Sequence, residues 1–192
     1  RLPLARAGGG RVPYKPPLGL HTCLCLLIST HANEFSAMRF RLIDQITQLE
    51  EGRSIEGIKH LTVAERYLQD HFPRFPIMPG VLMLESMYQA AYWLVRKSED
   101  FTHSLVLLKE ARNIKFSGFV QPGQDLVVTA TVKKQDGNWT TLVTRGTVDG
   151  KDVASARLIV ETSHLTEQYP HRAASENYLM RKVRQQFERA LS

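Results

Sequence analysis

The segment His71-Phe-Pro-Arg-Phe-Pro-Ile-Met-Pro-Gly80 runs directly into Val81-Leu-Met-Leu-Glu85-Ser-Met-Tyr-Gln89-Ala-Ala-Tyr-Trp-Leu-Val95. Its first part holds three prolines in seven residues, which exclude regular structure and predict a rigid, shaped loop. Its second part lacks internal glycine and proline and is apolar on nearly every face, which predicts a helix over residues 80–95. This helix is shorter than the ~20 apolar residues that cross a bilayer, and it carries Glu85 and Gln89 near its middle. We therefore expect a helix buried in a protein core, and no membrane partner.

Extended segments precede and follow this helix in the chain. Residues 40–49 and 54–62 have the composition of a two-stranded hairpin that turns at Glu51-Gly52. Turn-forming pairs and triplets separate the segments of the second half, because glycine, asparagine and aspartate tolerate positive φ. These predicted strands are residues 104–116, 125–134, 139–148 and 153–161.

Apolar and polar residues alternate cleanly in two of these strands, at Leu126, Val128, Ala130 and Val132 and again from Ala154 to Val160. One face of the sheet is therefore expected to be buried. A sheet with one apolar face needs a cover, and an apolar helix needs surroundings. We expect an α+β fold, in which an antiparallel sheet of five to six strands wraps around the central buried helix.

Composition divides the chain into a body and two tails. With 43% hydrophobic and 23% charged residues, the chain has the composition of one ordinary domain, which we place at residues 38–170. Residues 171–192 are expected to form a basic amphipathic helix, with a stripe of Leu179, Val183, Phe187 and Leu191. We expect this stripe to pack on the sheet or on a sister subunit; docking of an acidic partner is the alternative.

Residues 1–37 are rich in glycine and proline and show no periodicity, so we expect a disordered extension. An export signal, a transit segment and a non-native extension stay open as alternatives. The net charge of +6 comes from the two tails, because residues 38–170 hold equal numbers of basic and acidic residues. No basic face interleaved with aromatics is visible there, and nucleic acid is not an expected partner.

Glu85 is the residue that the buried helix does not explain, because an unpaired buried carboxylate is costly and is normally neutralised or paired. Gln89 lies one turn later on the same face and can hydrogen-bond it. His71 is held by a proline-rich loop, and fixed geometry is what a general base requires. Gly80 opens the helix, whose first N–H groups can polarise a carbonyl oxygen. An acid, a base and oxyanion donors together suit proton abstraction beside a carbonyl. For Glu85, a structural pairing with an arginine is the alternative.

Other kinds of site find little support in the sequence. The two cysteines, Cys23 and Cys25, are too few for a disulfide framework or a four-cysteine zinc site. The histidines other than His71 lack metal-ligand spacing, and no glycine-rich phosphate loop follows a predicted strand. We expect neither a metal nor an organic cofactor.

The string from His71 to Gln89 resembles the signature of the bacterial 3-hydroxyacyl-(acyl-carrier-protein) dehydratases of fatty-acid synthesis. Further similar segments are Leu42-Ile-Asp44, Asn113-Ile-Lys-Phe116 and Pro122-Gly123, so the resemblance covers roughly residues 40–162. It implies a hot-dog fold and a cytoplasmic homodimer with shared active sites, which can assemble further into a trimer of dimers. Its substrate is then a thioester of acyl carrier protein or coenzyme A.

The resemblance also implies a role for individual residues. His71 of one subunit removes the proton at C2, and Glu85 of the other protonates the departing hydroxyl. Gly80, Val81 and Gln89 are expected to bind the thioester. The residues expected to line the acyl tunnel are Phe72, Met78, Tyr88 and Phe119.

Several positions depart from the family pattern. Asp70 and Arg74 replace glycines beside the predicted base, Ser117-Gly118 replaces a basic pair near the carrier entrance, and Phe119 replaces a proline. A hot-dog thioesterase, in which Glu85 activates water, and a non-catalytic acyl-binding protein are the alternatives. The retention of His71 favours the dehydratase.

Overall fold

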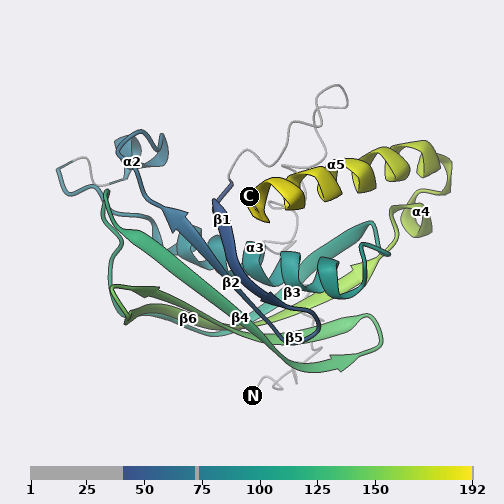
Figure 1. Ribbon diagram of the computed structural model, residues 1–192, viewed down its shortest axis with the longest axis horizontal. Helices are drawn as coiled ribbons and strands as arrows, with labels where there is room; N and C mark the ends of the chain where they lie inside the picture. The colour runs from purple at the N-terminus through teal and green to yellow at the C-terminus, as the bar shows by residue number, and fades with distance from the viewer. Residues whose placement is uncertain (1–40, 72–73, 192) are drawn as a thin grey trace, which may run out of the picture. The chain divides into compact units, whose positions relative to one another are not determined.

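Six antiparallel strands form a single sheet in the order β1-β2-β4-β5-β6-β3 (Figure 1). The computed structural model describes residues 41–71 and 74–191, apart from the side chains of Asp70 and Gln168. The expected N-terminal extension, residues 1–37, lies outside the described residues. The strands are β1 (Gln45–Glu50), β2 (Ser54–His60), β3 (Leu105–Phe116), β4 (Asp125–Asp136), β5 (Trp139–Val148) and β6 (Lys151–Ser163). The helices are α2 (Tyr67–Asp70), α3 (Gly80–Ser98), α4 (Leu165–Gln168), the 3-10 helix η1 (Pro170–Arg172) and α5 (Ala173–Leu191).

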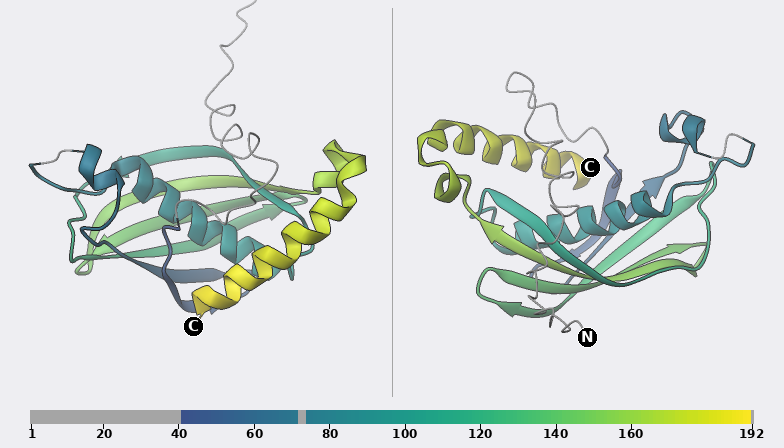
Figure 2. Two further views of the ribbon diagram at one scale, coloured as in Figure 1. Left: turned by 90° about the horizontal axis from the view of Figure 1, so that it is seen from above. Right: turned by 180° about the vertical axis from the view of Figure 1, so that it is seen from behind.

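Helix α3 lies in the hollow of the curved sheet (Figures 1 and 2). Met87, Ala90 and Leu94 are fully buried on its inner side. The alternating residues of β4 and β6 face them, as the fully buried Leu126 and Leu158 show. The expected α+β fold, with an antiparallel sheet wrapped around a buried helix, is therefore confirmed.

The predicted turns form where the sequence favours positive φ. Gly52 joins β1 to β2 with φ of 71°, and Gly137 joins β4 to β5 with φ of 57°. Asp149 and Gly150, with φ of 49° and 73°, form the two-residue turn between β5 and β6. Two-residue turns of this kind match the twist of the strands that they join, and they connect β4, β5 and β6 in succession.

Helix α5 crosses the C-terminal half of α3 and covers the side that faces away from the sheet (Figure 2). Phe187 packs against Trp93 and Phe101, with ring centroids 5.7 and 5.3 Å apart. The expected stripe holds at Val183 and Phe187, which are buried, but it ends at Ala190 and leaves Leu191 49% exposed. A helix turns once in about 3.6 residues, so constant four-residue steps drift off the buried face.

Two four-residue helices, α2 and α4, were not predicted. Neither has a side-chain N-cap, and both are too short to show an apolar period. Among the described residues, no helix combines the length and the apolar character that a membrane span requires.

A buried lysine ties the segment between β2 and α2 to the sheet. Lys59, the penultimate residue of β2, is 5% exposed. Its ammonium lies 2.7 Å from a carboxylate oxygen of Glu65 and 3.1 Å from one of Asp44. Asp44 also accepts a 2.9 Å hydrogen bond from the N–H of His60. This cluster fixes the place where the chain leaves β2 for α2.

Replacing Lys59 with Met should destabilise the fold by about 2–3 kcal/mol, because it leaves two partly buried carboxylates without a cation. Urea unfolding of the wild type and the variant measures this difference. Lys134→Met is the matched control, since its pair with Asp136 is exposed, and it should leave the unfolding midpoint unchanged. Equal midpoints for all three proteins would show that the Lys59 cluster adds nothing to stability.

Candidate active site

Glu85 lies in the second turn of α3, on the border between the buried and exposed sides of the helix. Removal from water raises the pKa of its carboxyl group above the ordinary range of a glutamate. A hydrogen bond from Gln89 partly offsets this increase, because it favours the charged form. The carboxyl group is therefore more readily protonated than that of an exposed glutamate.

Gln89 links this carboxyl group to the backbone. Its Nε2 donates to Oε1 of Glu85 over 3.0 Å, which confirms the expected hydrogen bond. Its Oε1 accepts a 2.9 Å hydrogen bond from the N–H of Leu42, ahead of β1. Because the backbone N–H can only donate, it orients the amide with its NH2 group towards Glu85. Gln89 is 1% exposed, so this orientation is held inside the core.

His71 directly follows α2 and has an extended backbone, with φ of −111° and ψ of 105°. Its side chain is partly exposed. Phe72, an expected tunnel residue, lies outside the described residues, which resume at Arg74 in the proline-rich loop. The predicted base and the predicted acid therefore belong to different elements, with the base before the loop and the acid after it.

The first backbone N–H groups of α3 receive no hydrogen bond acceptor from the side chain of the N-cap residue. Pro79 occupies the N-cap position and offers no side-chain cap, and the first turn contains no acidic residue. The first N–H groups of a helix have no partner inside the helix, and they carry its positive dipole end. Gly80 and Val81 are the first two residues, and the side chain of Val81 is 69% exposed. This helix end is therefore suited to binding a carbonyl oxygen.

The ring of Phe116 lies over the N-terminus of α3 and accounts for the glycine at position 80. A Cβ atom added at Gly80 would lie 3.3 Å from three ring carbons of Phe116 on β3. That approach is closer than ordinary van der Waals contact, so any larger residue would displace the ring or the helix end. Gly80 therefore allows β3 to approach the N-terminus of α3.

The other expected tunnel residues occupy different environments. Met78 is 1% exposed, and its N–H donates to the carbonyl of Val120 over 2.9 Å. Tyr88 donates from its hydroxyl to the carbonyl of Val106 on β3 over 2.7 Å. Phe119 is 63% exposed and packs edge-on against Phe75, with ring centroids 6.3 Å apart. Met78 thus lies inside the subunit, Tyr88 is partly buried and Phe119 lies on the surface.

The Ser117-Gly118 departure has a physical cause. A Cβ atom at Gly118 would lie 2.8 Å from Cγ1 of Val153, which leaves no room for a side chain. The N–H groups of Ser117 and Gly118 both donate to the carbonyl of Val153. The segment is therefore fixed against β6, and the basic residue of relatives has no space at position 118.

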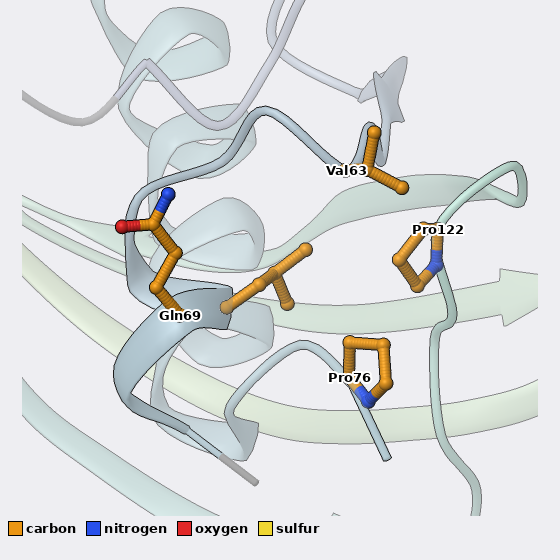
Figure 3. Close-up of a pocket in the computed structure, with 5 residues that line it drawn as sticks. Val63, Gln69, Pro76 and Pro122 are labelled. Atoms are coloured by element: carbon orange, nitrogen blue, oxygen red, sulfur yellow. The ribbon is translucent and has the colours of Figure 1, made fainter. Parts of the chain in front are cut away.

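A pocket of about 230 Å³ opens beside the segment that carries His71 (Figure 3). Leu68 and Gln69 of α2 form one wall, and Pro76 and Pro122 form another, with Val63 at its rim. Within residues 41–71 and 74–191, no three His, Cys, Asp or Glu side chains are close enough to hold a metal ion.

Sequence reasoning missed the residues that position the site through their backbone or shape. Leu42 orients Gln89 with its N–H, Val120 anchors the proline-rich loop with its carbonyl, and Phe116 shapes the end of α3. Leu42 and Phe116 stand in segments that resemble the dehydratases, and this resemblance was their only signal. Backbone contacts leave no mark on residue type.

Comparison with known proteins finds relatives over most of the chain. A family model described as a FabA-like domain matches residues 35–157. The 3-hydroxyacyl-[acyl-carrier-protein] dehydratase FabZ of Rickettsia felis is 40% identical over 119 residues, which cover 62% of this chain and 82% of that protein. The FabZ protein of Pediococcus pentosaceus is 35% identical over 137 residues, which cover 70% and 92%.

Solved structures support the fold. A chain of the dehydratase heterocomplex ApeI:P from Xenorhabdus doucetiae superposes with a TM-score of 0.56 at 18% identity, covering 67% of this chain and 86% of that one. The structure of smu.793 from Streptococcus mutans UA159, bound to acetyl CoA, gives 0.52 at 14% identity, covering 69% and 97%. The expected hot-dog fold is confirmed.

The match spans most of the chain and includes α3 with Glu85, Gln89 and the loop before it. This chain belongs to the FabA-like family of 3-hydroxyacyl-[acyl-carrier-protein] dehydratases.

Proposed function

We propose that this protein dehydrates (3R)-3-hydroxyacyl thioesters of acyl carrier protein to trans-2-enoyl thioesters in cytoplasmic fatty-acid synthesis. The observation that carries the proposal is Glu85, a carboxyl group whose pKa is raised by burial and whose orientation is fixed by Gln89. A structural glutamate would be paired with a cation, whereas the described partner of Glu85 is a neutral amide. A protonated carboxylic acid is what a departing hydroxyl group requires.

The reaction needs one proton removed and one supplied. His71 takes the proton from C2, and the electron pair that remains forms the double bond between C2 and C3. The C3 hydroxyl departs as water after Glu85 has given it a proton. Proton transfer from His71 to the Glu85 carboxylate, through solvent, restores both groups. No electron acceptor is involved in this sequence.

The thioester carbonyl is proposed to accept hydrogen bonds from Gly80 and Val81. Negative charge develops on this oxygen while the C2 proton leaves, and the positive end of α3 stabilises that charge. The uncapped first turn supports this role, because neither the N-cap residue Pro79 nor an acidic side chain of the first turn competes for the donors. The ring of Phe116 packs close to one side of this helix end.

We further propose that two subunits share each site, with His71 of one facing Glu85 of the other. Strand β3 supports this arrangement, because it lies at an edge of the sheet and carries the exposed apolar residues Ile114 and Phe116. An edge strand with apolar side chains invites pairing with another chain. Exposed Val81 and Phe119 extend the apolar surface around the N-terminus of α3.

Replacing His71 with Ala, or Glu85 with Gln, should each lower the dehydration rate by about 10²- to 10⁴-fold, as expected for loss of a general base or acid. Enoyl absorbance measured with a 3-hydroxybutanoyl thioester reports the rate, with acyl carrier protein and coenzyme A as alternative carriers. His171→Ala and Glu50→Gln are matched controls at exposed positions. Release of free thiol without enoyl absorbance would identify a thioesterase instead. The absence of both signals would indicate an acyl-binding protein without catalytic activity.

The two inactive variants should complement each other when mixed as unfolded chains and refolded together. A mixed dimer then has one site with both His71 and Glu85 and one site with neither. Random pairing makes half of the dimers mixed, so about a quarter of the wild-type activity should return. Activity after co-refolding, compared with each variant refolded alone, measures this effect. No recovery, with dimers present by size-exclusion chromatography, would place each site within one chain.

Glu85→Gln should unfold at a higher urea concentration than the wild type at neutral pH. Burial raises the pKa of the Glu85 carboxyl group in the folded protein. The protonated group therefore contributes fully to the free energy of unfolding below the unfolded-state pKa of about 4.3, and this contribution is lost as the pH rises through the folded-state pKa. The difference between the two proteins should therefore vanish towards acidic pH. Urea unfolding over a pH series tests this, with Glu50→Gln expected to follow the wild type. A wild-type enzyme more stable than Glu85→Gln at neutral pH contradicts the assignment.

A further inference from the structure

Three large polar side chains follow Glu85 along one side of α3. Tyr88, Tyr92 and Arg96 stand three, seven and eleven residues after Glu85, which brings them to the same helix face. Tyr88 begins less than one turn beyond the carboxyl group, at about 4.5 Å of axial rise. An acyl chain that passes Glu85 in this direction meets the tyrosine rings first.

The tyrosines are fixed in place. The hydroxyl of Tyr88 donates to the carbonyl of Val106 over 2.7 Å, so its ring bridges α3 and β3. The ring of Tyr92 packs edge-on against it, with centroids 6.3 Å apart. Burial raises the pKa of both hydroxyl groups, so both stay neutral near neutral pH. Rotation of Tyr88 away from α3 would leave a buried carbonyl without its donor, which is unfavourable.

Arg96 closes the far end of this face. It is 3% exposed, and its guanidinium donates to the carbonyls of His103 over 2.5 Å and Ser104 over 2.7 Å. The same guanidinium lies 4.8 Å from the centroid of the Tyr92 ring. Met180 of α5 covers it from outside, with its sulfur 3.7 Å from Nη1. A charged group held by two carbonyls is a poor neighbour for an alkyl chain.

The direction of the acyl tail follows from exposure to water. Gly80 and exposed Val81 lie on the N-terminal side of Glu85, where solvent reaches the helix. Tyr88 and Tyr92 are partly buried, and residues 93–96, which follow them, are buried between the sheet and α5. An alkyl tail that leaves water must therefore extend towards Tyr88 and Tyr92.

We propose that Tyr88, Tyr92 and Arg96 block the acyl path just beyond Glu85 and restrict this protein to short 3-hydroxyacyl thioesters, of the butanoyl and hexanoyl class. This inference rests on the proposed dehydratase function and names its substrate class. The aromatic rings set the length limit, and Arg96 with α5 holds them against β3.

The first measurement is a chain-length profile of the wild-type protein. The ratio kcat/KM should fall at least about tenfold from the 3-hydroxyhexanoyl to the 3-hydroxydodecanoyl thioester, because a closed pocket rejects added methylenes. Equal or rising values with length would overturn the inference while leaving the dehydratase function intact. Absence of enoyl product from every thioester would instead overturn the proposed function.

Tyr92→Leu opens the proposed block and should raise the kcat/KM of the dodecanoyl substrate about tenfold or more, with little change for the butanoyl substrate. Phe187→Leu is the matched control, because it removes a ring that packs behind α3 on Trp93 and does not face Glu85. The control should keep the wild-type profile. An equal shift in both variants would show that general loosening, and not the removed ring, admits the longer chain.

Tyr88→Phe provides a second test that preserves the core volume. It removes the hydrogen bond to Val106 and leaves the ring, so the ring can rotate and the dodecanoyl rate should rise by a smaller factor. Binding of a non-reactive dodecyl thioether of pantetheine, measured by calorimetry, should tighten in the same order as the rates. An unchanged profile in both tyrosine variants would overturn the inference.

Discussion

The structure depends on one constraint: a helix that is apolar on nearly all sides must be enclosed, although it carries a carboxyl group. The sheet covers one side of α3, and α5 crosses the opposite side of its C-terminal half. Glu85 lies on the border between the two sides. Full burial of an ionised carboxylate without a partner would lower the free energy of unfolding by several kcal/mol. The chain responds with a neutral partner, Gln89, whose own acceptor is satisfied by the backbone at Leu42. The result is a carboxyl group that favours its protonated form.

The same constraint couples stability to chemistry. Desolvation of Glu85 disfavours the charged form and so works against folding at neutral pH, yet in the proposed mechanism it supplies the acid that dehydration needs. The uncapped N-terminus of α3 has a similar dual character. A side-chain cap would stabilise the helix by about 0.5–2 kcal/mol, but it would occupy the N–H groups that we propose to bind the thioester carbonyl. Both features are local departures from stable design at one site.

The fold was largely predictable because its elements carry strong periodic signals. The alternation in β4 and β6, the positive-φ turns and the uninterrupted apolar run of α3 each specify one structure. The hydrogen bond between Glu85 and Gln89 was predictable from their spacing on a helix. Position 118 was not, because only the approach of Val153 explains its glycine. Backbone donors such as Leu42 were also invisible, since any residue but proline offers an N–H group. Sequence therefore indicates the candidate chemical groups more readily than the backbone groups that hold them in place.

Arg96 shows how a costly group can define a boundary. Two carbonyls and an aromatic ring surround its guanidinium, and one of its N–H groups, Nε, has no described hydrogen-bond acceptor. Packing alone would be served as well by an apolar side chain of similar volume, often with a gain in stability. An apolar residue cannot supply directional hydrogen bonds. The planar guanidinium binds the carbonyls just before β3, which fixes the end of α3 against that segment, and it packs on the Tyr92 ring. If the acyl chain follows the proposed path, an apolar end would leave this helix face compressible and would admit a longer chain. The buried charge is therefore better explained by the shape that it maintains than by the stability that it adds.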